Sequence, residues 1–389
     1  MSLAVSILAR RETLAEAVDA LAERYWNNEP VEDLVSGLTK TFDTLIIDLW
    51  RQHFSDTSGC ALFAVGGYGR AELHPGSDID ILVLAEKPQR HRETIEAFLR
   101  DLFDLNVEVG HSVRDIKTCV KECRGDITVA TALFERRFLT GDASLIAPLD
   151  KALQHRKIWP IEDFFIAKRD EQVARHRHYD NVDYNLEPNI KTSPGGLRDI
   201  HTTLWVCNRQ FGTTDIEELV RLEVLTDIEA RWLRDGMRFL WWVRYGLHTL
   251  AGRKEDQLHF ARQRELSQRL GFMDTESKSA VELFMQHYYR HVMALSEVND
   301  IILQYFQEDI VAKKKPTMEP LNERFRLVNR RIDVVQPDIF LKNPSAMLEM
   351  FLLMAQREEN IRVRVTAIRA LRDAVHLIDE EFRRNPENC

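Results

Sequence analysis

The stretch that most constrains this chain is a glycine turn followed at short distance by two acids. Leu62 to Val65 has the apolar character of a buried strand, and Gly66-Gly67 follows it at once. The run Ser77 to Ile81 begins ten residues after the glycine pair and contains Asp78 and Asp80. Because side chains alternate along a strand, we expect both aspartates on one face and the two isoleucines against the core. Glycines there can also bring backbone N–H groups against a phosphate.

Each of these motifs is common by itself, and a lone example is more often a turn or a pair of solvated acids. A third acid strengthens the combination, because Glu108 alternates with Val107 and Val109 in a second apolar run. Between the acidic strands, helical spacing joins Ile95, Phe98, Leu99, Leu102 and Phe103. The predicted order is therefore strand, acidic strand, helix, acidic strand.

Three convergent carboxylates repel one another unless cations neutralise them. Carboxylate oxygens are the ligands that magnesium and manganese prefer. We therefore expect Asp78, Asp80 and Glu108 to share divalent metal bridged to the phosphates of a nucleotide.

This pattern resembles the polymerase-beta-like nucleotidyltransferase superfamily, whose signature is a glycine turn, an Asp-x-Asp pair and a third strand acid. Within it, residues 66–80 are very similar to the bacterial PII uridylyltransferase/uridylyl-removing enzymes. The resemblance continues through 107–114 and 184–199, with weaker echoes at 251–258 and 281–290. The segment 184–199 is the most specific to this family.

The resemblance implies transfer of UMP from UTP to a tyrosine of a PII signalling protein, with release of pyrophosphate. Asp78 and Asp80 would hold Mg²⁺, or Mn²⁺, and Glu108 would orient or deprotonate the tyrosine. The expected phosphate-binding residues are Gly66, Gly67, Arg70, Ser77 and Lys191. Of these, Arg70 and Lys191 have the alternative of being surface charges, and Lys191 is expected to face the acids across a cleft. Asn189 and Asp199 are candidates for shaping the pocket from the helical region, but capping and packing explain these two residues equally well.

The expected fold class is α+β, because strand patterns give way to long helical ones after about residue 150. A chain of 389 residues is too long for one ordinary core. We expect an N-terminal helical segment (1–56), a small mixed-sheet nucleotidyltransferase domain (57–150), a helical uridylyltransferase-associated domain (151–310) and a final region (311–389). That region should hold a lysine-rich connector around 313–320, a hairpin of 325–328 with 332–335, and helices over 345–356 and 361–382.

Longer relatives in this family continue into an HD-type phosphohydrolase domain and paired ACT domains that sense glutamine. None of the thirteen histidines here is followed directly by aspartate. We therefore expect an N-terminal fragment or a truncated relative that lacks the uridylyl-removing and glutamine-sensing domains.

Composition narrows the remaining classes. A net charge of −9 argues against a general nucleic-acid binder, and no apolar run is long enough to suggest a membrane span. The five cysteines form no convincing disulfide framework. Cys119 and Cys123 would be helical neighbours near His111, but without Cys-x-x-Cys spacing we expect ordinary reduced thiols and a cytoplasmic setting.

Two alternatives remain open from sequence alone. One is another nucleotidyltransferase, such as an adenylyltransferase acting on a protein or small molecule. The other is a catalytically silent regulatory module that binds nucleotide. The presence of all three acids argues against the silent module.

Overall fold

The computed structural model forms two compact units, Met1–Asn299 and Asp300–Cys389. It combines many helices with two small sheets, so the predicted α+β class is confirmed. The described residues are 2–56, 59–154, 158–179, 185–310, 316–357 and 361–385.

The first unit is built on a four-stranded mixed sheet in the order β3-β2-β1-β4. β1 is antiparallel to both β2 and β4, whereas β2 and β3 are parallel. Parallel neighbours need a long crossover, which α4 supplies between them. The strands are β1 Cys60–Ala64, β2 Ile79–Ala85, β3 Val109–Arg114 and β4 Arg137–Gly141.

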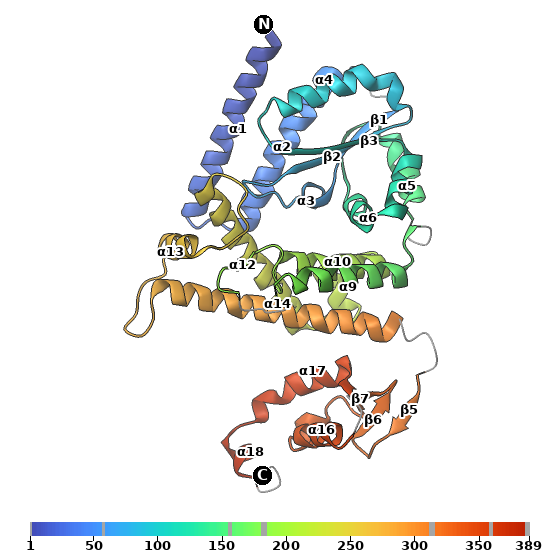
Figure 1. The fold of residues 1–389 in the computed structure, drawn as a ribbon, viewed down its shortest axis with the longest axis vertical. Helices are drawn as coiled ribbons and strands as arrows, with labels where there is room; N and C mark the ends of the chain where they lie inside the picture. Colours follow the sequence, from blue (N-terminus) through green and yellow to red (C-terminus); the bar gives the residue numbers. More distant parts are fainter. Residues whose placement is uncertain are drawn as a thin grey trace. The chain divides into compact units, whose positions relative to one another are not determined.

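Alternation along the strands divides the core of this sheet into two layers. Leu62, Ile81 and Val83 belong to a core formed with α1, α2 and α4, whereas Phe63 and Leu82 belong to one formed with α5, α6 and α7. Figure 1 shows α4 on one side of the strands and α5 with α6 on the other. The sheet is therefore covered on both faces, and only its edges and strand ends are open for a site.

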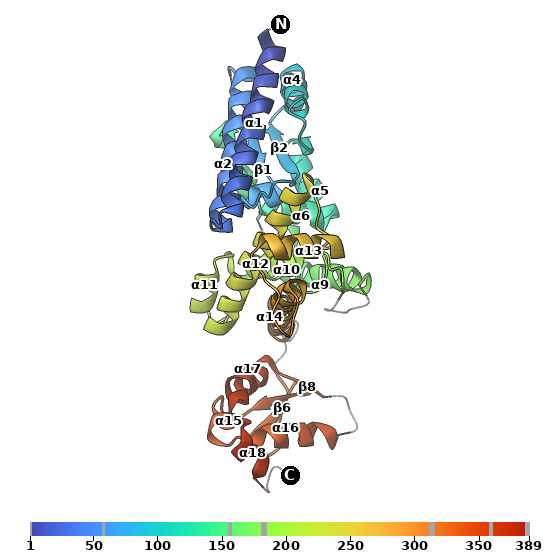
Figure 2. The same cartoon turned by 90° about the vertical axis from the view of Figure 1, so that its left-hand side faces the viewer.

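The apolar residues of α2 repeat at helical spacing: Phe42, Ile46, Leu49 and Trp50 are buried, and Leu45 is partly buried against the same core. α1 packs beside α2 (Figure 2). The helices of this unit are α1 Ser2–Trp26, α2 Val31–His53, α3 Gly66–Gly69, α4 Arg92–Phe103, α5 Ile116–Gly125, α6 Ile127–Phe134, α7 Ile146–Ala152, α9 Ile161–Arg177, α10 Leu197–Phe211, α11 Ile216–Arg221, α12 Asp227–Ala251 and α13 Phe260–Arg269, with 3₁₀ turns η1 Pro88–His91 and η2 Ala143–Leu145. α14 Ala280–Ile310 begins in this unit and continues into the second.

α12 has well-defined ends that position the segment following it. Thr226 and Glu229 form a reciprocal capping box at its start. Gly252 follows the last turn in the left-handed conformation, with φ of 62°. The chain therefore leaves the helix abruptly at Ala251, and residues 253–258 turn back toward the strand ends of the sheet.

The second unit contains the predicted hairpin. Its two turn residues, Asn329 and Arg330, have φ of 50° and 62°, as a tight two-residue hairpin requires. The strands are β5 Met318–Pro320, β6 Phe325–Val328, β7 Arg331–Val334 and β8 Arg362–Val363, and the helices are α15 Ile339–Lys342, α16 Ala346–Ala355, α17 Val365–Ala374, η3 Val375–Leu377 and α18 Glu380–Arg384. The predicted continuous helix over 361–382 is wrong, because residues 362–363 pair with β7 instead. The lysines at 313–315 lie outside the described residues.

Trp50→Ala should destabilise the first unit, because Trp50 is fully buried and stacks on Phe54 at 3.7 Å between ring centroids. Removing a buried aromatic ring typically costs about 3–5 kcal/mol of unfolding free energy. The matched control is Leu8→Ala, a helical leucine that is 57% exposed, for which about 0.5 kcal/mol or less is expected. Urea unfolding of the two variants would test this; equal losses would show that α2 does not anchor the core.

Candidate active site

A pocket opens where the glycine turn, the start of β2 and the helical part of the first unit meet. Two of the three predicted carboxylates, Asp78 and Asp80, line it together with Lys191. The full lining is Gly66, Gly67, Arg70, Glu72, Leu73, His74, Ser77, Asp78, Asp80, Thr128, Thr131, Ala132, Glu135, Lys191, Leu197, Arg198, His201, Trp205, Trp241, Arg244 and Lys254.

Asp80 lies in β2, directly opposite Gly110 of β3. A Cβ atom at Gly110 would come within 2.1 Å of the Asp80 carboxylate, so only glycine leaves it this position. Burial raises the pKa of Asp80, and the nearby charge of Asp78 raises it further. The environment thus favours a cation close to this carboxylate.

Asp78 comes one residue before β2, and it differs from Asp80 in already having a cation. Its Oδ2 atom accepts a hydrogen bond from the ammonium of Lys254 at 2.5 Å. Its Oδ1 atom is buried and has no hydrogen-bond partner among the described residues. One carboxylate oxygen is therefore neutralised while the other keeps its full capacity to accept.

Glu108 lies at the same edge, because its carbonyl oxygen accepts the N–H of Ile79 at 2.8 Å. Its side chain is exposed and does not line the pocket. Its negative charge contributes to raising the pKa of Lys254. Across the described residues, no group of three or more histidine, cysteine or acidic side chains is arranged to hold a metal ion.

The turn after β1 presents backbone to the pocket. Gly66 and Gly67 begin the short α3, so their N–H groups have no partner within that helix. Ser77 also lines the pocket, and its Oγ accepts the N–H of His74 at 2.9 Å. The hydroxyl proton of Ser77 is left to donate, since a serine oxygen both accepts and donates.

Arg70 is neither a free cation nor a surface charge. Its guanidinium forms ion pairs of 2.7 Å with both Glu72 and Glu135. Trp205 donates its indole N–H to Glu135, and His201 contacts Glu72 at 3.1 Å. Burial and the charge of Arg70 lower the pKa of His201 to about 3. This wall of the pocket is a packed network of opposite charges with a neutral histidine.

Lys191 projects from a structured turn that begins at Asn189. The Asn189 Oδ1 atom accepts the N–H groups of Lys191 and Thr192 at 3.1 and 2.9 Å, as a capping side chain does. Asp199 has a structural role as well, because it accepts the N–H of Gly195 at 2.8 Å. Burial lowers the pKa of Lys191 to about 8, helped by the positive charges of Arg244 and Arg198.

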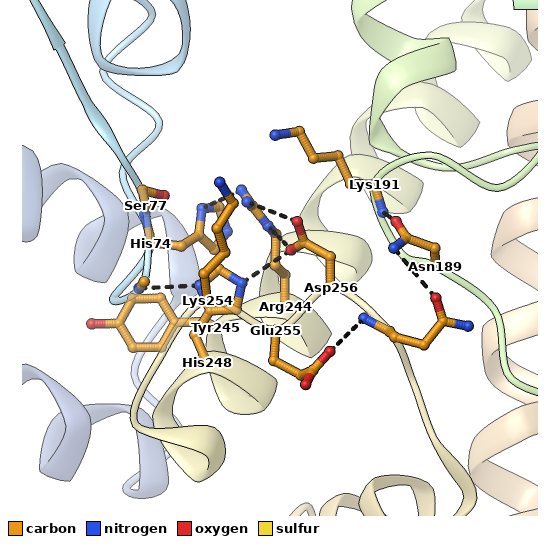
Figure 3. Close-up of polar contacts among 12 residues, drawn as sticks. His74, Ser77, Asn189, Lys191, Arg244, Tyr245, His248, Lys254, Glu255 and Asp256 are labelled. Atoms are coloured by element: carbon orange, nitrogen blue, oxygen red, sulfur yellow. Dashed lines mark hydrogen bonds and ion pairs between the residues drawn. The ribbon is translucent and has the colours of Figure 1, made fainter. Parts of the chain in front are cut away.

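Sequence reasoning missed a buried network that joins α12 to the loop before β2 (Figure 3). Arg244 and His248 of α12 contact Asp256 at 2.7 and 3.0 Å. The other ring nitrogen of His248 accepts the N–H of Gly76 at 3.1 Å. Burial opposes ionisation of Asp256, yet the hydrogen bonds from His248 and Arg244 hold its pKa below the usual range. The family-like stretches 66–80 and 251–258 contain Gly76 and Asp256, but none of the family-like stretches contains Arg244 or His248.

Cys119 and Cys123 are neighbours on a helix, as their spacing predicted. Both are free and buried in α5. Burial raises their pKa to about 11 and about 12, which disfavours the thiolate that binds metal. Cys389 lies outside the described residues.

Among the described helices, none is both long enough and apolar enough to cross a lipid bilayer.

Asp256→Asn should lower the unfolding free energy by about 3 kcal/mol at neutral pH, because it leaves Arg244 buried without its carboxylate. Since the folded-state pKa of Asp256 is lowered from 3.8, its contribution is present above that pH and is lost as the pH falls below it. Urea unfolding at neutral pH and at about pH 3 would measure both effects. A difference in unfolding free energy between variant and wild type that does not shrink in acid would contradict this prediction. The control is Glu276→Gln, at an exposed position.

Three family models match the chain. A nucleotidyltransferase domain matches residues 46–139, the GlnD PII-uridylyltransferase model matches 163–303, and the uridylyltransferase GlnD third domain matches 325–389. The first two matches together include the pocket residues from both the sheet and the helices.

Curated relatives align along nearly the whole chain. Bifunctional uridylyltransferase/uridylyl-removing enzymes are 45% identical in Pseudomonas aeruginosa (strain LESB58), 44% in Pseudomonas putida (strain GB-1) and 43% in Ectopseudomonas mendocina (strain ymp). Each alignment covers 386 residues, which are 98% of this chain and 43% of the relative. The chain therefore spans less than half the length of these relatives. Its residues place it in the PII-uridylyltransferase family, as a counterpart of the N-terminal part of the bifunctional members.

Proposed function

We propose that this chain transfers UMP from UTP to a tyrosine of a PII signalling protein and releases pyrophosphate. The observation that carries the proposal is the pairing of Asp78 and Asp80 beside the glycine turn, in a pocket that also receives Lys191. The family matches supply the choice of UTP and PII.

The donor set fits a hard divalent cation such as Mg²⁺. Asp78 has a buried oxygen without a partner, and Asp80 has a pKa raised by burial and by Asp78. Magnesium is commonly held by one or two carboxylates together with water and substrate phosphates, so a complete protein cage is not required. When bound, the ion would offset charge on the phosphates. Asp78 and Asp80 are the proposed ligands, with Glu108 as a third.

The chain's own groups would position the triphosphate in this pocket. Gly66 and Gly67 offer backbone N–H groups, Ser77 offers a hydroxyl donor, and Lys191 offers a positive charge. Such fixed donors favour in-line attack by holding the phosphate chain in one orientation. Arg70 is committed to Glu72 and Glu135, so we propose that it shapes the wall of the nucleotide pocket.

Glu108 is proposed to act on the incoming tyrosine. Its side chain is exposed beside the carboxylate edge. A protein substrate reaches an exposed group more easily than one inside the pocket. Glu108 would orient the tyrosine hydroxyl or accept its proton as the oxygen attacks the α-phosphate.

The defining experiment is incubation of the chain with labelled UTP, Mg²⁺ and a PII protein, followed by mass measurement of the acceptor. A gain of one UMP on a tyrosine is expected. Asp78→Asn and Asp80→Asn should each reduce the rate by about a hundredfold or more, because a metal carries several kcal/mol of charge stabilisation. Asp104→Asn, at an exposed acid after α4, is the control. Normal rates in the two folded site variants, or labelling from ATP instead of UTP, would contradict the proposal.

Lys191→Ala should weaken UTP binding by about tenfold, the range for losing one charge-assisted contact. In the free protein the ammonium loses its proton as the pH rises through about 8. UTP affinity should therefore fall between about pH 7 and pH 9, whereas Lys191→Arg should stay charged and flatten this dependence. Calorimetric titration measures each variant. If Lys191 had only a structural role, Lys191→Ala would instead lower the unfolding free energy and leave the pH dependence of UTP affinity unchanged.

A further inference from the structure

Lys254 forms an ion pair with Asp78, one of the carboxylates proposed to bind the metal. Its Nζ atom lies 2.5 Å from Oδ2 of Asp78, although the two residues are 176 positions apart in sequence. A lysine side chain in contact with a carboxylate is a cation at neutral pH. In the structure, a lysine ammonium therefore provides positive charge to the acidic edge of the sheet.

The backbone of Lys254 is fixed. A Cβ atom at Gly76 would come within 2.4 Å of the Lys254 nitrogen, so the two backbones touch. Asp256, two residues later, is held by Arg244 and His248, and its carbonyl accepts the N–H of Ile190 at 2.8 Å. The attachment point of the lysine is therefore rigid relative to Asp78.

The head of Lys254 has the opposite character. Its side chain is 38% exposed and forms an ion pair with Asp78. A lysine carries its charge on a flexible four-carbon stem, so the ammonium can move several ångströms while the backbone stays in place. An exposed pair of this kind is weak, typically about 1 kcal/mol or less.

Two other cations of the pocket are held by acids. Arg70 is paired with two glutamates, and Arg244 is paired with Asp256 and contacts His74 at 3.3 Å. Of the cations that line the pocket, Lys254 combines direct contact with a proposed metal ligand and an exposed, flexible head.

We propose that Lys254 is a positioning residue that acts as the resident counter-ion of Asp78 and is exchanged for divalent metal when metal and nucleotide bind. In the free protein its ammonium neutralises Oδ2 of Asp78 and competes with metal. Once metal arrives with the nucleotide, the ammonium leaves Asp78 and pairs with the phosphates. This inference rests on the proposed function for the choice of UTP as the nucleotide.

Lys254→Met tests the exchange, because methionine keeps the length of the stem and removes the charge. Without nucleotide, the full chain should bind Mn²⁺ about fivefold more tightly, since no ion pair must break. Electron paramagnetic resonance of the free ion measures this affinity. At saturating Mn²⁺, UTP affinity measured by calorimetry should become about fivefold weaker. Changes of opposite sign are the expected signature.

Two further variants separate this exchange from general effects. Lys254→Arg retains the charge and should keep the Mn²⁺ affinity of the wild type. Arg253→Met removes a neighbouring charge that is 76% exposed and should change neither affinity beyond about twofold. Unchanged or weaker Mn²⁺ binding by Lys254→Met, or unchanged UTP binding, would overturn the proposal.

Both measurements are of binding and need no transfer reaction. If the chain failed to modify PII while the opposing shifts were observed, the proposed function would fail and the exchange at Asp78 would stand. If transfer to PII occurred without those shifts, the proposed function would stand and the exchange at Asp78 would fail.

Discussion

The largely buried carboxylate of Asp256 holds the pocket together. It joins Arg244 and His248 of α12 to the segment that follows this helix, and His248 in turn fixes the loop at Gly76. Because a buried charge is tolerated only with close partners, these three side chains have little freedom to separate. The position of Lys254 relative to Asp78, and hence the shape of the acidic edge, depends on this network.

The charged side chains that line the pocket differ in their freedom to move. On one wall, Arg70 is locked between Glu72 and Glu135, and burial keeps His201 neutral. At the acidic end of the pocket, beside the start of β2, the carboxylates of Asp78 and Asp80 are only partly compensated. A closed network maintains shape, whereas uncompensated charge binds ligands, so the acidic end is where a metal–phosphate complex fits best.

Sequence reasoning worked where chemistry is local and weakened where it depends on distant contacts. The glycine turn, the strand with Ile79 and Ile81 facing inward and the hairpin at Asn329 follow from periodicity and turn preferences. The order of strand, acidic strand, helix and acidic strand along the chain followed from these patterns, and the α+β class followed from them together with the family resemblance. Roles for Asp78, Asp80, Glu108 and Lys191 remain predictions.

Other features were beyond the reach of sequence spacing. The ion pair of Asp78 with Lys254 joins residues from different parts of the chain, and no local pattern encodes such a contact. Arg70 shows the same limit for one of its two partners, because Glu135 is 65 positions away and comes close only where the end of α6 packs against the turn at Gly69. The exposed position of Glu108 depends on where β3 begins, which hydrophobic alternation locates only to within a residue or two.

The composite origin of the pocket has a consequence for exchanging parts between relatives. Its acids lie in the segment that matches a nucleotidyltransferase domain (46–139), and Lys191, Arg244 and Lys254 lie in the segment that matches the uridylyltransferase model (163–303). A chimera that took only the first segment would combine one parent's carboxylates with another parent's cations. To keep the charges of the site matched, the two segments must therefore come from the same parent, although they match as separate domains.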